Sequence, residues 1–251
     1  MRTTPSSDSS HGRSLQWPGC LNVRDAGGLP TEDGGHVRPG ALIRSDFLGR
    51  LTPAGRRELD SYGVSRLLDL RSVEEVARRR SPFVDDPRYR HVPLADPARR
   101  TERHPENERT LRDIYRVKIE RDAHRIVAGI AAVTDAPPGG VLVHCVLGKD
   151  RTGILVALIL RAIGVPEEVV VADYAATAVS LREKFEAELA RVRDPRIREI
   201  LRQKQGSDPA TILGMLDRVD ELHGSVPGYL LDRGLRPDEL ERLRHRLRAN
   251  A

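Results

Sequence analysis

Cysteine, lysine and aromatic residues are scarce in this 251-residue sequence, and long apolar runs are absent. The two cysteines, Cys20 and Cys145, cannot form a disulfide framework, which is typical of a protein in a reducing compartment. The N-terminus lacks the apolar stretch of a signal peptide, and no run of about 18 apolar residues could span a bilayer. We therefore expect a cytoplasmic protein without stable membrane insertion, and leave open its export by a route that needs no such signal.

The charge is mildly basic, but the pattern is not that of a nucleic-acid-binding protein. The 42 basic and 37 acidic residues give a formal net charge of +5. Acidic residues are interspersed among the arginines, and the aromatic content of 4% is too low for a surface on which bases stack. We expect no nucleic acid as partner, whereas the positive charge favours attraction of an anionic substrate.

Short apolar runs alternate with helical patterns over the first two thirds of the chain. Ser72 with Glu75 forms a capping box, which predicts the start of a helix. Further helical patterns cover residues 53–62, 105–135 and 152–163. We expect strands at residues 41–45, 64–71, 89–94 and 140–145. This alternation predicts the α/β class, with a central, largely parallel sheet flanked by helices.

The two ends of the chain differ from this alternating part. Residues 1–14 are polar and rich in serine, and we expect a disordered N-terminal tail. Residues 15–251 are expected to form a single domain, whose last part, residues 166–251, is a helical extension. The charged segment at residues 98–121 has two interpretations, a solvated helix or a helical lid. The sequence predicts no oligomeric state.

The segment Val141–Leu160 places a cysteine between an apolar strand and an apolar helix. Cys145 ends the strand, and Arg151 lies six positions later. A tight loop there can direct successive N–H groups into one anion-binding concavity, and the helix adds the positive end of its dipole. Gly148 permits the backbone conformations of such a loop. We therefore expect a stabilised Cys145 thiolate beside an Arg151 fork that holds two phosphate oxygens, an arrangement suited to attack on phosphorus through a phosphocysteine.

Other interpretations of this loop explain fewer of its residues. A nucleotide-binding P-loop needs G-x-x-x-x-G-K-[ST], but Val143 stands at the first glycine position and Asp150 follows Lys149. A buried packing cysteine accounts for Cys145 alone and leaves the glycine and the charged residues after it unexplained. The eight histidines show no metal-ligand spacing, so we expect neither a metal nor another cofactor.

The loop sequence HCVLGKDRTG resembles the H-C-x5-R-[ST] signature of the cysteine-dependent protein tyrosine phosphatase superfamily. Together with NVRDAGG, IRSD and LLDLR, it makes the chain from about Trp17 onward similar to the bacterial protein tyrosine phosphatase B-like family. The resemblance implies a protein tyrosine phosphatase-like fold without a metal, a C-terminal helical region and, in some members, a helical lid. It also implies activity on phosphotyrosine, phosphoserine or phosphothreonine, and phosphoinositides.

The resemblance implies a role for each residue of the loop. Cys145 matches the nucleophile and Arg151 the phosphate clamp. His144 matches the residue that orients the cysteine, and the Thr152 hydroxyl matches the group that assists the thiolate and turnover of the intermediate. We expect the Lys149 ammonium to be solvated and to contact the anionic substrate. The other expected substrate-binding residues are Val146, Leu147, Gly148 and Gly153.

Three aspartates are candidates for the general acid that protonates the leaving oxygen. The resemblance points to Asp150, which could also be an N-cap or first-turn acid that complements the helix dipole. Asp96 follows a strand, but a turn residue before Pro97 is the simpler interpretation. Asp69 ends another strand, where a structural pair with an arginine is the simpler interpretation. We predict Asp150.

Two further features have a structural and a functional interpretation. NVRDAGG could shape the pocket, but we favour an ion pair between Arg24 and Asp25 beside a glycine turn. Cys20 could form a regulatory disulfide with Cys145 if their Cα atoms lie within about 7 Å, but we favour a bystander thiol.

The sequence predicts a phosphatase that cleaves phosphate monoesters through a phosphocysteine, with a phosphoprotein or a phosphoinositide as substrate. A small phosphorylated metabolite, such as a sugar or nucleoside phosphate, is the alternative substrate. Two other functions use a similar loop: a non-catalytic module that binds phosphorylated partners, and a rhodanese-like sulfur transferase. Cys145 together with Arg151 argues against the binding module, since a binder needs no nucleophile.

Overall fold

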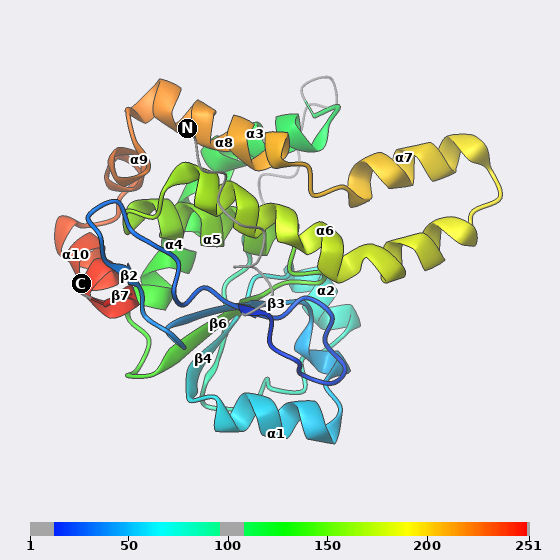
Figure 1. Ribbon diagram of the computed structural model, residues 1–251, viewed down its shortest axis with the longest axis horizontal. Coiled ribbons are helices and arrows are strands. Elements are labelled where there is room, and N and C mark those ends of the chain that lie inside the picture. The colour runs from blue at the N-terminus through cyan, green and yellow to red at the C-terminus, as the bar shows by residue number, and fades with distance from the viewer. Residues whose placement is uncertain (1–12, 96–107, 250–251) are drawn as a thin grey trace, which may run out of the picture.

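The computed structural model describes residues 13–95 and 108–249, and a five-stranded sheet lies at its centre (Figure 1). The strand order is β1-β3-β6-β4-β5; β1 pairs antiparallel with β3, and the other neighbours run parallel. The strands of this sheet are β1 (Arg24–Asp25), β3 (Leu42–Ser45), β4 (Val64–Asp69), β5 (Tyr89–His91) and β6 (Gly140–His144). The mainly parallel sheet, flanked by helices, confirms the predicted α/β class.

Each of the four predicted strands is shorter in the structure than in the prediction, by one to three residues at one end. β5 ends at His91 rather than Leu94, because Pro93 has no N–H group to donate to a neighbouring strand. A second, two-stranded sheet, which no pattern predicted, pairs β2 (His36–Val37) with β7 (Arg248–Ala249). It joins an early loop to the C-terminal end of the described chain.

Local capping chemistry sets several helix starts. Ser72 Oγ accepts the Glu75 N–H at 3.3 Å and the Glu75 carboxylate accepts the Ser72 N–H at 2.7 Å, which confirms the predicted capping box. The expected helix at 105–135 is two helices that meet at Asp122, whose carboxylate accepts the Lys118 ammonium at 2.6 Å. The helices are α1 (Pro53–Ser61), α2 (Val73–Arg78), α3 (Leu111–Arg121), α4 (Ala123–Thr134), α5 (Asp150–Ala162), α6 (Glu167–Ala190), α7 (Pro195–Gln205), α8 (Pro209–His223), α9 (Val226–Asp232) and α10 (Pro237–Leu247), with a short 3-10 helix, η2 (Leu48–Arg50).

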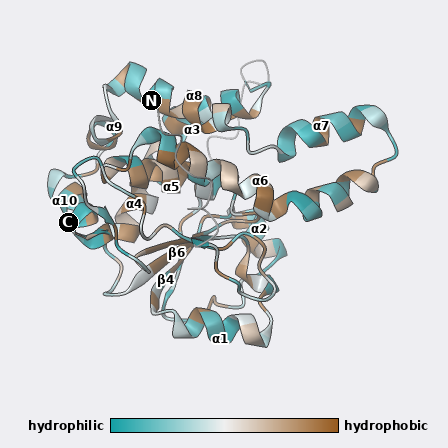
Figure 2. Cartoon of the chain, in the orientation of Figure 1, coloured by the Kyte–Doolittle hydropathy of each residue, from teal (hydrophilic) through white to brown (hydrophobic). Residues whose placement is uncertain are grey.

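Helices cover both faces of the sheet (Figure 1). Successive residues of a strand point to opposite faces, so Leu142 joins the smaller apolar core with Leu59 of α1. Val141 and Val143 join the larger core beneath α4, α5 and α8. Residues 152–160 of α5 are all buried, and Figure 2 shows the hydrophobic colour gathered on α5 and the sheet. The β6–α5 junction is therefore held between two packed layers.

The 24-residue helix α6 runs past the edge of the sheet and turns into α7, so the two helices project from the body as an arm (Figure 1). The near end of α6 packs on α5 and α8. The arm returns to the body at the end of α7, next to the start of α8.

Several expectations fall partly outside the described residues. Residues 1–12 of the expected tail lie outside the described residues. Arg13 forms an ion pair with Asp173 at 3.0 Å, and Ser14 forms a β-bridge with Arg24. The tail was therefore predicted too long. Of the expected lid or solvated helix, residues 98–107 also lie outside; the rest includes α3, which packs on α8 with Tyr115, Lys118 and Ile119 buried, so α3 is not a wholly solvated helix. Within residues 13–95 and 108–249, no helix combines the length and apolar character that a membrane span needs.

Candidate active site

The β6–α5 loop, residues 145–149, connects the central strand to the buried helix at the carboxyl edge of the sheet. Parallel register brings the ends of three strands together there: Ser45 and Asp69 both lie opposite His144. Cys145 follows directly and is 2% exposed. Gly148 has a φ of +64°, and a Cβ at this position would lie 2.5 Å from the Ser45 carbonyl oxygen, so the loop requires glycine here.

Three consecutive carbonyl groups of this loop accept hydrogen bonds from residues outside the loop. Val146 O accepts the Phe47 N–H at 3.1 Å, Leu147 O accepts Asn22 Nδ2 at 2.8 Å, and Gly148 O accepts Arg44 Nη2 at 2.8 Å. A trans peptide places its N–H opposite its carbonyl, and the described chain has no cis bond. The next N–H groups, those of residues 147–149, therefore point away from this framework, an orientation in which backbone amides can bind an anion together.

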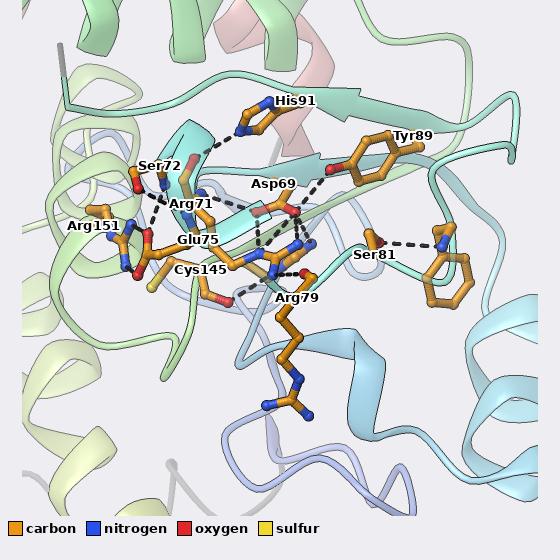
Figure 3. A network of polar contacts seen from close by, with 12 residues as sticks. Asp69, Arg71, Ser72, Glu75, Arg79, Ser81, Tyr89, His91, Cys145 and Arg151 are labelled. Atoms are coloured by element: carbon orange, nitrogen blue, oxygen red, sulfur yellow. Dashed lines mark hydrogen bonds and ion pairs between the residues drawn. The ribbon is translucent and has the colours of Figure 1, made fainter. Parts of the chain in front are cut away.

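Arg151 lies in the first turn of α5 and is aligned by a carboxylate from another helix (Figure 3). Its two terminal nitrogens donate to the two carboxylate oxygens of Glu75, with 2.9 Å between Nη2 and Oε1. Burial alone would raise the pKa of Glu75, but the hydrogen bonds and charge of Arg151 outweigh it and lower that pKa. Burial likewise opposes the charge on Arg151, yet Glu75 and the neighbouring Cys145 raise its pKa. The guanidinium fork is thus charged and fixed in orientation.

Asp69 and His144 lie buried beside Cys145. The Asp69 carboxylate is 0% exposed and accepts Arg71 Nη2 at 2.6 Å and the Tyr89 hydroxyl at 3.0 Å (Figure 3). It is therefore the structural partner of an arginine and is shielded from any ligand. His144 Nε2 lies 3.9 Å from Asp69 Oδ2, and Nδ1 lies 3.2 Å from Cys145 O; burial lowers the pKa of His144, so its ring is neutral at neutral pH.

Asp150 is the first residue of α5, and its side chain is 41% exposed. Its Oδ1 accepts the hydroxyl of buried Tyr115 at 2.8 Å and lies 3.2 Å from Lys149 Nζ. The carboxylate is thus held at the loop and is open to solvent on one side, in the first-turn position that complements the helix dipole. Asp96, the third candidate acid, lies outside the described residues.

The comparisons with known proteins agree with this geometry. The chain matches the tyrosine phosphatase family over residues 15–249. It belongs to that family. It is similar to the triple specificity protein phosphatase PtpB of Mycobacterium tuberculosis, with 31% identity over 90% of this chain and 96% of the relative. It is also similar to a tyrosine-protein phosphatase of Nostoc commune, with 30% identity over 82% of this chain and 74% of the relative. The chain is therefore a phosphatase, rather than a non-catalytic module or a sulfur transferase.

In this phosphatase Lys149 is not solvated, contrary to the prediction. Its side chain is 2% exposed, and Nζ donates to Lys204 O at 2.6 Å and Gly206 O at 3.0 Å. The last carbonyls of a helix have no partner within the helix, and they attract a cation. Lys149 thus ties the end of α7 to the β6–α5 loop. Nothing local in the sequence indicates a partner 55 residues away.

Two other expected site residues pack at the start of α5. Thr152 is 0% exposed, and its Oγ1 has no hydrogen-bond partner among the described residues. Gly153 allows α6 to approach α5 closely, because a Cβ there would lie 2.9 Å from a ring carbon of Tyr174. The structure therefore places Thr152 within the buried wall of the loop and gives Gly153 a packing function.

The sequence analysis missed the residues that support the loop from a distance. Glu75 was recognised only as part of a capping box, although its carboxylate also holds Arg151. Arg24 does not pair with Asp25 as predicted; it lies 3.7 Å from Asp173 of α6. The only indication in the sequence was the presence of charged residues in the motifs NVRDAGG and IRSD. Their partner, Asp173, lies too far along the chain to be recognised from the sequence.

The part of the chain that the structure describes offers neither a second reactive thiol nor a group of metal ligands. Both cysteines are free thiols, and burial with the charge of Asp46 raises the pKa of Cys20 to about 12, so that Cys20 stays protonated and unreactive. Among the described residues, no group of three or more His, Cys, Asp or Glu side chains is arranged to hold a metal ion.

Proposed function

We propose that this phosphatase hydrolyses phosphate monoesters through a covalent phosphocysteine at Cys145. The observation that carries the proposal is the combination of a cysteine, a nest of backbone amides and an aligned guanidinium at one end of the sheet. Cys145 begins the loop, and Arg151 follows it on α5 with its fork held by Glu75. Such a site binds the charge that a transferring phosphoryl group carries and offers it a nucleophile.

In the first step the Cys145 thiolate attacks phosphorus in line with the leaving oxygen. The sulfur–phosphorus bond forms as the bond to the leaving oxygen breaks, while the loop amides and Arg151 hold the equatorial oxygens. Asp150, in its protonated form, donates a proton to the leaving oxygen, which departs as an alcohol or phenol. Its partial exposure lets it reach a substrate that enters from solvent.

In the second step water attacks phosphorus on the face that the leaving group has left. The Asp150 carboxylate accepts a proton from this water, the phosphorus–sulfur bond breaks, and inorganic phosphate and the Cys145 thiolate are released. We assign support of the thiolate to two buried neighbours. His144 lies behind Cys145 and contacts its backbone carbonyl, and Thr152 offers a hydroxyl with no partner among the described residues.

For substrates we propose phosphotyrosine in proteins and phosphoinositides. The support is the family of the chain and the triple specificity in the name of its Mycobacterium tuberculosis relative. The test is a panel of phosphotyrosine peptide, phosphoserine peptide, phosphoinositide and nucleoside monophosphate compared by kcat/KM. Preference for the nucleoside monophosphate would replace the proposal with the small-metabolite alternative. The cytoplasmic location stays a prediction, which cell fractionation tests.

The mechanism is tested by Cys145→Ser, with Cys20→Ser as a matched control. Turnover of an aryl phosphate should be lost in Cys145→Ser and kept in Cys20→Ser, while both proteins still bind inorganic phosphate. Trapping of radiolabelled phosphate on the acid-quenched wild type, but on neither the folded Cys145→Ser variant nor a no-substrate control, would support the intermediate. Turnover by Cys145→Ser at the wild-type rate would refute it.

A further inference from the structure

A buried ionic cluster lies behind the β6–α5 loop. At its centre Asp173 of α6 forms ion pairs with Arg44 at 2.6 Å, with Arg13 at 3.0 Å and with Arg24 at 3.7 Å. The side chains of Asp173, Arg24 and Arg44 are at most 3% exposed. One carboxylate thus faces three guanidinium groups that come from the N-terminal segment, β1 and β3.

Two chains of hydrogen bonds connect this Asp173 cluster to the loop. In the first, Arg44 binds Asp173 through Nη1 and donates from Nη2 to Gly148 O at 2.8 Å. In the second, Arg24 donates to the Asn22 side-chain oxygen, and Asn22 Nδ2 donates to Leu147 O at 2.8 Å. Two successive carbonyls of the loop are therefore held by groups that Asp173 orients.

The cluster is ionised and fixed on α6. Burial raises the pKa of Asp173, but the charges of Arg24 and Arg44 outweigh it and hold that pKa well below its usual range. Burial and the charge of Arg44 lower the pKa of Arg24 to about 9, so Arg24 is still charged at neutral pH. Arg24 Nη2 also donates to Thr177 Oγ1, one turn further along α6, at 3.0 Å. The guanidinium groups of Arg24 and Arg44 are thus held by α6 and linked to the loop, that of Arg44 directly and that of Arg24 through Asn22.

We propose that the Asp173 cluster positions the β6–α5 loop, so that Asn22 and Arg44 are positioning residues for phosphate binding. A carbonyl held on the far side forces the N–H of the same trans peptide toward the substrate. Without the donors behind it, the loop can rotate these peptides and present carbonyl oxygens to the phosphate, which would repel it. This inference rests on the proposed function, and it names the residues that hold the loop in the conformation that binds phosphate.

The test compares Arg44→Met and Arg44→Lys with Arg246→Met as matched control. Arg246 also donates to carbonyls of a loop, those of Ala136, Pro137 and Gly139, but at the opposite end of the sheet. The assays measure kcat, KM and the inhibition constant for orthovanadate, well below the melting temperature of each variant. We expect Arg44→Met to weaken vanadate binding about tenfold or more, as loss of a charged hydrogen bond predicts.

Other outcomes separate positioning from stability. Arg44→Lys should recover part of the vanadate affinity, and Arg246→Met should keep all of it even if its melting temperature falls equally. Should Arg44→Met fail to fold, Asn22→Asp serves. It keeps the acceptor for Arg24, replaces the donor to Leu147 with a carboxylate oxygen and adds one negative charge beside Arg24. If a folded Arg44→Met or Asn22→Asp variant kept the wild-type KM and vanadate affinity, the inference would be wrong. Turnover by the wild type would in that case still support the proposed function. A wild type without turnover would instead refute the function.

Discussion

Replacement of Asp150 by asparagine tests the assignment of the general acid with little change in shape. Asparagine is nearly the same size, and its Oδ1 can still accept the Tyr115 hydroxyl that Asp150 accepts at 2.8 Å. What the variant lacks is a carboxyl proton to give to the leaving oxygen. A folded Asp150→Asn protein should therefore bind phosphate like the wild type but turn over poorly those substrates whose leaving group needs protonation.

The size of the effect follows from the chemistry and from the two contacts of Asp150. General acid catalysis contributes about 10²- to 10⁴-fold, or roughly 3 to 5 kcal/mol of transition-state stabilisation. Tyr115→Phe leaves the acid in place and removes one of its two contacts, the other being Lys149. One hydrogen bond contributes about 1 kcal/mol, so Tyr115→Phe should cost only about fivefold.

The assay is kcat/KM for a series of aryl phosphates whose phenols differ in pKa. Wild-type rates should depend weakly on the pKa of the phenol, because the acid neutralises the charge that develops on the leaving oxygen. Asp150→Asn rates should fall steeply as that pKa rises, with near-normal rates for the most acidic phenols. Equal slopes for the wild type and Asp150→Asn would refute the assignment and direct attention to Asp96.

Three further predictions concern the loop and its supports. Gly148→Ala should abolish phosphate binding and lower the melting temperature, because its φ is +64° and its Cβ would lie 2.5 Å from Ser45 O; wild-type binding would contradict this account. Lys149→Met should speed amide hydrogen exchange at residues 204–206, since the buried ammonium bonds carbonyls there; unchanged exchange would argue against the tie. Glu75 has a lowered pKa, so its pair with Arg151 should stabilise the fold above about pH 4.3, the usual glutamate value, and lose this effect as pH falls through the folded pKa. Glu75→Gln should therefore show a shallower acid-side fall in the free energy of unfolding than the wild type.

Features encoded by neighbouring residues could be predicted well. The α/β alternation, the capping box of Ser72 and Glu75, and the loop between Cys145 and Arg151 all depend on short stretches of chain. The prediction failed where a residue contacts a segment that is distant in the sequence. Lys149 was expected to be solvated, but its ammonium donates a hydrogen bond to a carbonyl at the end of α7.

The sequence by itself determined which groups the β6–α5 loop offers, because a cysteine, a glycine that permits φ above zero and an arginine six residues after the cysteine lie in one short stretch, and the mechanism that we propose depends on these groups. The tertiary structure alone decided which charges support that loop. Glu75 lies 76 residues from Arg151, and Asp173 lies 129 residues from Arg44. An arginine-rich chain offers many partners of equal charge, and burial beside a particular carboxylate selects among them only after the sheet and helices have packed.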